Sequence, residues 1–501
     1  MSKATAFVAV DLGASGGKVS VGTFDNGTFS LHDVHRFSNG GISVWAHGPS
    51  GAIEKTYWDD LALFAEIVEG LRKAGLASKA PIASIGIDTW GADAALLNRH
   101  GESLGPVYCY RDHRLDTIRE ELFERISARE LFDLSGIPAQ PWYLINQLFW
   151  LGKHRPEMLG VVDAVLPIAS VFQYYLCGAK AAEQTFMAVQ QLCTVGTASY
   201  NERLLQAAGI PKHILPEVVP PGTILGTLRP ELVAATGLAG CKVVAVKTHD
   251  TASAYTAAPV SDRSKSLIIS SGTWSLVGKL MDKPLVNQTA FAGLLANEGV
   301  EGDVRLLRNV MGTWPVQQLR DAWSKADGKE LSWDEIVRLS GSAKPLATVI
   351  DMDDPSLYNP SDMETAIRAQ IHRTGQQDPA GRGELVRAVY EGLAIKVAQI
   401  NRLIEQATGT KHEVVHIVGG GARNALLNQF IADATGLPVQ AGPYEATCIG
   451  NILVQAVACG AVESLPAAQR LVSDSLPTVK FAPSRQHDWP AAERRLAELT
   501  K

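Results

Sequence analysis

Near its N-terminus the chain contains an apolar, strand-like run that ends close to a carboxylate and is followed by a turn rich in glycine and serine. The run covers residues 7–12 and includes Asp11, the turn is Gly13-Ala14-Ser15-Gly16-Gly17, and Lys18 opens a second strand-like run. Glycines let a backbone come close to a ligand, so that several N–H groups can converge on an anion. Because Asp11 beside such a turn would repel a phosphate, a divalent cation between the two is expected. The pattern predicts a hairpin with a nucleotide–metal site at its turn.

Two common phosphate-binding motifs do not describe this turn. Its spacing differs from that of a Walker A loop, and a strand follows where a Walker A loop leads into a helix. The turn also lacks the G-x-G-x-x-G order of dinucleotide-binding proteins. Since Gly/Ser turns are common in hairpins, the turn by itself is compatible both with a plain structural hairpin and with a ligand site.

Length and composition restrict the class of protein. A chain of 501 residues is too long for one ordinary hydrophobic core, which predicts two large domains. The chain has 46% hydrophobic residues, 20% charged residues and a formal net charge of −6, a globular composition with no excess of positive charge for nucleic acid or an anionic membrane. Six scattered cysteines form no C-x-x-C pair and indicate neither a disulfide framework nor a zinc site.

No segment has the pattern of a secretion signal or a membrane span. The first apolar run meets a charge at Asp11 and is too short for a signal peptide. No run of about 18 apolar residues occurs anywhere in the chain. We therefore expect a cytoplasmic protein without membrane or nucleic-acid partners. The sequence leaves the oligomeric state open.

The order of strand, Gly/Ser turn and strand occurs a second time in the chain. Residues 266–278 repeat it, with Ser271-Gly272-Thr273 as the turn. The second half then follows the first in its order of hairpin, helices, strand and helix. This repetition predicts two similarly built α/β domains, residues 1–260 and 261–501, with a ligand-binding cleft between them.

Three further strand-like segments are followed by residues of types that bind ligands or take part in catalysis. Their ends are Thr89-Trp90-Gly91 after residues 83–88, His249-Asp250-Thr251 after residues 242–246, and Gly419-Gly420-Gly421 after residues 413–418. The last turn leads into a helix, which is the context of a nucleotide site, but Asn424 breaks the dinucleotide fingerprint. Residues 211–230, rich in proline and glycine, predict loops.

The three Gly-rich turns, in this order, resemble the two phosphate motifs and the adenosine motif of the superfamily of sugar kinases, actin and chaperone ATPases. Within it the chain is similar to the FGGY carbohydrate kinases, and to their rhamnulokinase branch, over nearly its whole length. The matching motifs are residues 35–39, 87–91, 110–112, 249–254, 271–276, 297–299, 309–312 and 441–447. The resemblance implies an α/β fold of two actin-like (ribonuclease H-like) ATPase domains with an interdomain cleft.

The resemblance also implies an activity. An ATP-dependent kinase of this branch transfers the γ-phosphate to the 1-hydroxyl of a 6-deoxy-ketose such as L-rhamnulose, giving the ketose 1-phosphate, with ATP and Mg²⁺ as cofactors. The chain departs from the family pattern near the expected sugar and nucleotide sites, at Lys18, Ala94-Ala95, residues 294–296 and Thr313-Trp314-Pro315. L-Fuculose or another rare ketose therefore stays an alternative substrate.

One carboxylate is the candidate base. A sugar hydroxyl is a poor nucleophile, so a carboxylate within hydrogen-bond reach must take its proton. Position alone makes Asp250 an ordinary helix N-cap, whereas the resemblance makes it the catalytic base. The resemblance further implies sugar contacts from Trp90, Gly91, His249, Asp250, Thr251 and Asn309. For Trp90, a purely structural role in the core is the equal alternative.

For the nucleotide, the resemblance implies that the first turn holds the β- and γ-phosphates. The implied ATP-binding residues are Gly13, Ala14, Ser15, Gly16, Gly17, Lys18, Thr273, Gln317, Gly420 and Gly421, and Asp11 is assigned to Mg²⁺, directly or through water. A nucleotide-switched actin- or chaperone-like ATPase is the alternative from another class, but it would not need His249-Asp250 or Trp90-Gly91. A sugar-binding regulator without catalysis would be expected to lack a base at position 250.

Overall fold

The computed structural model describes residues 4–48, 51–358 and 360–500. The chain forms two compact units, each assembled from separate segments. The first consists of Met1–Ala257, Met281–Leu306 and Ala446–Leu476, and the second of Ala258–Leu280, Leu307–Glu445 and Pro477–Lys501. Among the described residues, no helix combines the length and the apolar character that a bilayer span requires.

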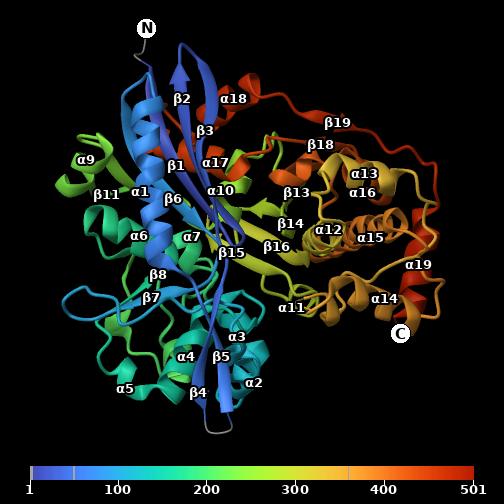
Figure 1. Ribbon diagram of the computed structural model, residues 1–501, viewed down its shortest axis with the longest axis horizontal. Coiled ribbons are helices and arrows are strands. Elements are labelled where there is room, and N and C mark those ends of the chain that lie inside the picture. Colours follow the sequence, from blue (N-terminus) through green and yellow to red (C-terminus); the bar gives the residue numbers. More distant parts are fainter. Residues whose placement is uncertain (1–3, 49–50, 359, 501) are drawn as a thin grey trace. The chain divides into compact units, whose positions relative to one another are not determined.

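A six-stranded sheet forms the centre of the first unit, with its strands in the order β11-β12-β6-β1-β2-β3 (Figure 1). The strands are β1 (Thr5–Gly13), β2 (Gly16–Asp25), β3 (Thr28–Ser38), β6 (Ile82–Thr89), β11 (Thr223–Thr227) and β12 (Lys242–Ala245). The hairpin expected at the first turn is present, because β1 pairs antiparallel with β2 and β2 with β3. Since β1, β6 and β12 run parallel, their carboxyl ends meet at one edge of the sheet.

Helices from distant parts of the chain cover this sheet. Helix α1 (Asp60–Ala77) begins where the Asp59 side chain caps the N–H of Ala62, and it buries an apolar stripe against the sheet. Helix α17 (Ala446–Ala458) lies beside β1 and β6 and against α10 (Asp250–Ala257) (Figure 1). Gly86 of β6 permits this approach, because a Cβ there would lie 2.4 Å from Asn451 Oδ1.

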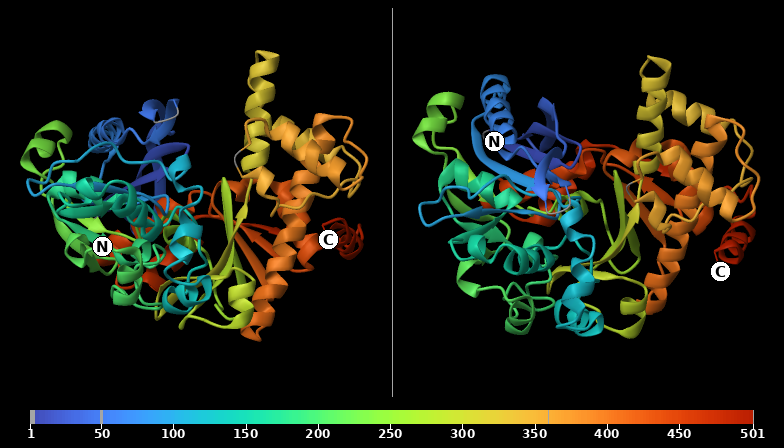
Figure 2. Two further views of the ribbon diagram at one scale, coloured as in Figure 1. Left: turned by 90° about the horizontal axis from the view of Figure 1, so that it is seen from below. Right: turned by 60° about the horizontal axis from the view of Figure 1, so that its bottom comes forward.

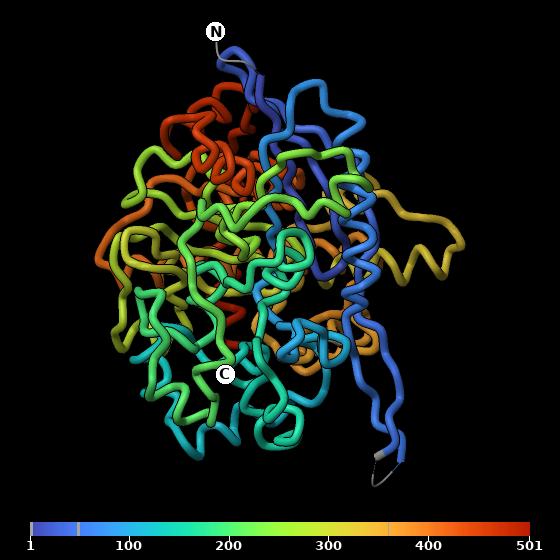
Figure 3. The backbone as a smooth tube through the Cα atoms, turned by 90° about the vertical axis from the view of Figure 1, so that its left-hand side faces the viewer, coloured from blue at the N-terminus to red at the C-terminus, as the bar shows by residue number. Residues whose placement is uncertain are grey.

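The remaining elements of the first unit are short. The β4–β5 hairpin extends away from the rest of the unit (Figure 3). The strands are β4 (Ile42–Gly48), β5 (Gly51–Tyr57), β7 (Ala94–Leu97), β8 (Ala164–Pro167), β9 (Ala181–Glu183), β10 (Glu217–Val219) and β15 (Ala296–Val300). The helices are η1 (His113–Leu115), α2 (Ile118–Phe123), α3 (Ala128–Ser135), α4 (Leu144–His154), α5 (Pro156–Leu159), α6 (Ile168–Cys177), α7 (Gln184–Met187), α8 (Glu202–Ala208), η2 (Lys212–Ile214), α9 (Pro230–Thr236), α11 (Gln288–Ala292) and α18 (Leu465–Ser475).

The second unit repeats the central pattern of the first. Its strands follow the order β16-β14-β13-β17-β18-β19, with β13 antiparallel to β14 and parallel to β17. The hairpin β13–β14 therefore occupies the same place in its sheet as β1–β2 does in the first. The strands are β13 (Ser266–Ser271), β14 (Trp274–Met281), β16 (Asp303–Met311), β17 (Val414–Val418), β18 (Val439–Ala441) and β19 (Val479–Phe481).

One long helix dominates the helical part of the second unit. Helix α15 (Arg382–Thr408), orange in Figure 2, ends at Gly409, whose φ of 71° gives the left-handed cap that glycine favours. It packs against α12 (Trp314–Asp327), α13 (Trp333–Gly341) and α16 (Ala425–Thr435). The other helices are η3 (Pro355–Leu357), α14 (Met363–Arg373), η4 (Gly420–Arg423) and α19 (Trp489–Leu499).

Candidate active site

The parallel strands of the first unit bring three chemistry-bearing segments to one edge of the sheet. Asp11 of β1 lies directly opposite Asp88 of β6. The N–H of Thr89 donates to the carbonyl of Thr248 at 2.9 Å, which ties the end of β6 to the segment before Asp250. The first turn, residues 88–91 and residues 248–250 are therefore neighbours, although they are far apart in the sequence.

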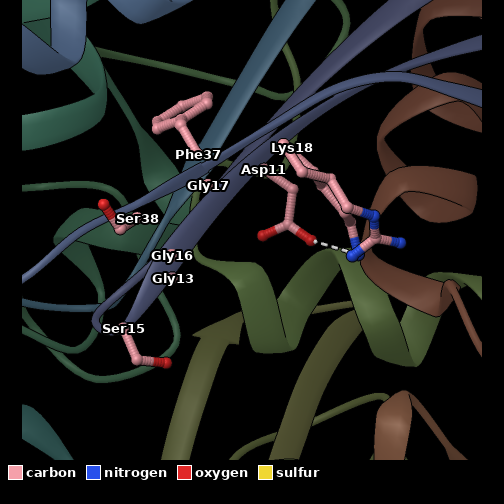
Figure 4. A pocket seen from close by; sticks show the side chains of 9 residues that line it. Asp11, Gly13, Ser15, Gly16, Gly17, Lys18, Phe37 and Ser38 are labelled. Atoms are coloured by element: carbon pink, nitrogen blue, oxygen red, sulfur yellow. Dashed lines mark ion pairs between the residues drawn. The ribbon is translucent and has the colours of Figure 1, made fainter.

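A pocket of about 550 Å³ opens at the first turn (Figure 4). Asp11 and Lys18 are direct partners across β1 and β2, and Lys18 Nζ lies 3.0 Å from Asp11 Oδ2. The lysine thus supplies a cation beside the turn. The pocket is lined by Asp11, Gly13, Ser15, Gly16, Gly17, Lys18, Arg36, Phe37 and Ser38.

The end of β3 and the residue that follows it support this turn, a role that sequence reasoning missed. The side-chain amide of Asn39 donates to the carbonyl of Gly13 at 2.8 Å. A Cβ at Gly17 would lie 2.3 Å from the ring of Phe37, so glycine is required for the turn to rest on this ring. The motif at residues 35–39 was the available signal, because it matched the family but had been given no function.

Asp250, the predicted base, is the first residue of α10. Its Oδ1 accepts hydrogen bonds from the N–H and the hydroxyl of Thr251, at 2.5 and 3.1 Å. Burial, together with repulsion from the carboxylate of Asp11 and from Glu298, raises the pKa of Asp250 to about 7. A carboxylate with a pKa in this range is suited to general-base catalysis near neutral pH.

His249 lies between two carboxylates. Its Nε2 is 3.5 Å from Asp250 Oδ1, and its Nδ1 is 3.5 Å from Glu298 Oε2. Burial, with a contribution from the guanidinium of Arg305, lowers the pKa of His249 to about 3. The imidazole is therefore neutral at physiological pH, and a neutral ring can accept a hydrogen bond from a hydroxyl at one of its nitrogens.

A buried ion-pair network continues from Glu298. Arg305 Nε lies 3.7 Å from Glu298 Oε2, and Arg305 Nη1 lies 3.8 Å from Asp303 Oδ2. Lys247 Nζ lies 2.7 Å from the same oxygen of Asp303. Burial raises the pKa of Glu298 to about 7, while Arg305 opposes the rise. The motif at residues 297–299 contained Glu298, but nothing in the sequence showed that it reaches His249.

Asp88 is the most enclosed carboxyl group at this edge. Its Oδ2 accepts from the Asn451 side chain at 2.6 Å, and its Oδ1 is buried without a hydrogen-bond partner among the described residues. Burial, and next the neighbouring Asp11 carboxylate, raise the pKa of Asp88. The protonated form of Asp88 is favoured, because two adjacent carboxylates repel each other.

Trp90 is an anchoring residue within the first unit. The indole is 5% exposed and lies 4.3 Å, centre to centre, from the ring of Trp58. Its N–H donates to Asp93 Oδ2 at 3.0 Å, and the N–H of Trp58 donates to the same oxygen at 2.7 Å. Asp93 itself has a φ of 74°, an unusual conformation for a residue other than glycine. The next residue, Gly91, accepts at its carbonyl from Gln190 at 3.0 Å.

The predicted nucleotide residues of the second unit gather around its Gly/Ser turn. The hydroxyl of Thr273 donates to Gln317 Oε1 at 3.3 Å, and Gln317 Nε2 donates to the hydroxyl of Thr313 at 3.2 Å. A Cβ added at Gly421 would lie 2.0 Å from Ser271 Oγ, so the backbone of Gly421 packs closely against Ser271. A Cβ added at Gly420 would have no atom within 4 Å. The structure thus brings Thr273, Gln317 and the third Gly-rich turn together.

Asn309, the remaining predicted sugar residue, belongs to β16 in the second unit. Its side-chain oxygen is buried and has no hydrogen-bond partner in the described part of the chain. An amide oxygen buried in this way gains most from a ligand that offers a hydroxyl or another donor.

Comparison with known proteins identifies the family of this chain. The FGGY family of carbohydrate kinases matches over both parts of the chain, its N-terminal domain at residues 43–256 and its C-terminal domain at residues 267–459. The chain belongs to the FGGY family of carbohydrate kinases. It is therefore a phosphotransferase with an alcohol group as acceptor and ATP as the phosphate donor, as the resemblance implied.

Relatives of this kinase align with it over nearly the whole length of both chains. It is 38% identical to the rhamnulokinase of Bacteroides thetaiotaomicron over 97% of both chains. It is 34% identical to the rhamnulokinase of Bacillus subtilis over 95% of both chains. Because the alignments span both units, the predicted membership of the rhamnulokinase branch is confirmed.

Solved structures share the fold of this kinase. A gluconate kinase from Lactobacillus acidophilus superposes with a TM-score of 0.77 at 16% identity, over 99% of this chain and 96% of that one. A xylulose kinase from Rhodospirillum rubrum gives a TM-score of 0.76 at 16% identity, over 99% and 98%. The predicted α/β fold of the actin-like kinases is confirmed by this similarity.

Proposed function

We propose that this kinase phosphorylates the 1-hydroxyl of L-rhamnulose to give L-rhamnulose 1-phosphate. The observation that carries the proposal is a set of relatives named rhamnulokinase that are 32–38% identical over nearly the whole chain. The site supports the reaction, because Asp250 lies in the same unit and at the same sheet edge as the phosphate-type turn. L-Fuculose and other rare ketoses are the competing acceptors.

In the proposed reaction, Asp250 takes the proton of the sugar hydroxyl. The hydroxyl oxygen forms a bond to the γ-phosphorus, the bond from that phosphorus to the β–γ bridging oxygen breaks, and ADP leaves. The N–H groups of residues 13–17 and the cation of Lys18 stabilise the negative charge on the phosphates. His249, Gly91 and Thr251 bind the sugar, together with Trp90 and Asn309. Thr273, Gln317, Gly420 and Gly421 bind the nucleotide.

The residues at the first turn also fit Mg²⁺. Among the described residues, no three or more histidine, cysteine or acidic side chains are grouped as a metal-binding cluster. Mg²⁺ in kinases needs no such cluster, because one or two carboxylates share it with water and phosphate oxygens. Asp11 offers a carboxylate next to the turn. We assign Mg²⁺ to Asp11; when bound, the ion neutralises phosphate charge.

A coupled assay of ADP release with a panel of ketoses tests this proposal. We expect release that depends on L-rhamnulose and a product that NMR identifies as the 1-phosphate. Asp250→Asn should lower kcat by about 10²–10⁴-fold, the usual contribution of a general base. Asp116→Asn, which changes an exposed carboxylate, serves as the control. If ADP release is faster with L-fuculose than with L-rhamnulose, L-fuculose is the substrate. If no sugar changes the rate of ADP release, the nucleotide-switched ATPase is favoured.

A further inference from the structure

The two carboxylates on either side of His249 differ in their access to water. The Asp250 side chain is 35% exposed, whereas the Glu298 side chain is 2% exposed. Water reaches part of the Asp250 carboxylate, whereas the buried Glu298 carboxylate depends on donors from the protein. The two nitrogens of the imidazole, each 3.5 Å from one of these carboxylates, are therefore in unequal surroundings.

The only cation next to Glu298 that the described structure records is buried itself. Arg305 is 0% exposed, and its three guanidinium nitrogens have no hydrogen-bond partner in the described part of the chain. Glu298 Oε2 and His249 Nδ1 are likewise buried without one. Arg305 Nε, 3.7 Å from Glu298 Oε2, stabilises the negative form of this carboxylate by its charge. His249 Nδ1, at 3.5 Å, lies closer to Glu298 Oε2 than Arg305 Nε does.

We propose that Glu298 is a positioning residue that holds His249 in the tautomer with its proton on Nδ1. The buried carboxylate then has a donor, whereas the opposite tautomer would direct a nitrogen lone pair at a buried anion. The doubly protonated imidazolium is excluded by the burial that keeps the ring neutral. Arg305 contributes indirectly, because its positive charge favours the ionised form of Glu298.

This assignment gives the unprotonated Nε2 a function in binding the acceptor. Nε2 faces Asp250, 3.5 Å from its Oδ1, so a hydroxyl of the sugar can donate a hydrogen bond to His249 while a neighbouring hydroxyl faces the base. Substrates must then carry a hydroxyl donor at the position next to the reacting one. This part of the inference rests on the proposed sugar-kinase function, whereas the tautomer itself does not.

The tautomer is measured on the free protein, without sugar or nucleotide. A ¹⁵N-labelled-histidine sample at pH 8.5, where Glu298 is mainly ionised, gives for each ring a protonated or an unprotonated signal at Nδ1 and Nε2. His249→Gln identifies the His249 signals among those of the 12 histidines. We expect a protonated Nδ1 and an unprotonated Nε2. A protonated Nε2, or an equal mixture of the two tautomers, would overturn the proposal whatever the substrate turns out to be.

Variants extend the test to catalysis. Glu298→Gln removes the charge with little change of shape, and Glu301→Gln changes an exposed carboxylate next to β15 as the matched control. We expect Glu298→Gln to lose the pure Nδ1–H signature and about 10- to 100-fold in kcat, with the KM for ATP unchanged. A wild-type histidine spectrum in Glu298→Gln contradicts the positioning role. If this variant does not fold, the wild-type spectrum decides alone.

Discussion

The ring of His249 lies against the backbone of Gly91, where a Cβ would be 2.5 Å from Nε2 and 2.7 Å from Cδ2. Contacts this short do not occur between a Cβ and a rigid ring, so any other residue at position 91 would displace the imidazole. The end of β6 and the start of α10 are thus fitted to each other at the site. Gly91 has a structural reason to be glycine, which adds to the sugar contact predicted for it.

Gly91→Ala should reduce activity by moving His249. A displacement of about 1 Å near reacting groups costs on the order of 10²-fold in rate, so we expect a loss of about this size in kcat/KM for the sugar. The KM for ATP should stay unchanged. Gly40→Ala, which introduces a methyl group into open space, is the control. Steady-state kinetics with normal activity in Gly91→Ala would show that the ring is not held by this contact.

The rate should depend on pH through the proposed base. Asp250 must be ionised to take a proton, and its pKa is raised to about 7. We therefore expect kcat/KM to increase about tenfold per pH unit below pH 7 and to level off above it. Glu298, whose pKa is also raised to about 7, can steepen this increase, whereas His249, with a pKa of about 3, should not contribute in this range. A profile that is flat from pH 5 to 8, measured at saturating Mg²⁺, contradicts the role of Asp250.

Asp88→Asn should stabilise the protein, and more so as the pH rises. A carboxyl group with a raised pKa keeps its proton in the folded state at pH values where the unfolded chain has released it, so the wild type loses stability as the pH rises above 3.8. Asparagine cannot ionise, and its side-chain oxygen can still accept from Asn451. We expect the Tm to rise by about 2 °C or more at pH 8.5, and by less at pH 6.

Thermal unfolding monitored by circular dichroism at both pH values measures this difference. Asp116→Asn, at an exposed carboxylate, should leave the pH dependence of the Tm as in the wild type. An advantage of Asp88→Asn that is the same at both pH values would mean that Asp88 is already ionised in the folded protein at pH 6.

Gly421→Ala should weaken ATP binding. A methyl group at this position would lie 2.0 Å from Ser271 Oγ, so the third Gly-rich turn must shift away from the second phosphate-type turn. We expect the KM for ATP to increase about tenfold or more, while the KM for the sugar changes little. Gly341→Ala, at an exposed helical position, is the matched control. An unchanged KM for ATP would separate this turn from the nucleotide.

The local patterns of the chain determined its strands, its turns and the family. Strand-like runs that end in Asp11, Asp88 and the segment before Asp250 are visible in the sequence, because buried parallel strands are apolar throughout and their ends are polar. The hairpins at the two Gly/Ser turns follow from the same short-range signals. Residues 211–230 were an exception, since β10 and β11 form there within a segment predicted as loops.

What the tertiary structure decided is which distant residues meet. Helix α17, from the C-terminal part of the chain, belongs to the first unit, where the side chain of Asn451 donates a hydrogen bond to Asp88. No local sequence pattern encodes a contact between residues so far apart in the chain. Glu298 reaches His249, and Asp93 holds Trp90, only because strand pairing and burial place them there. The sequence determined the chemistry of the hairpin at Asp11 and Lys18. The pKa values and the proton positions around Asp250 depend on burial and neighbouring charge, which exist only in the folded chain.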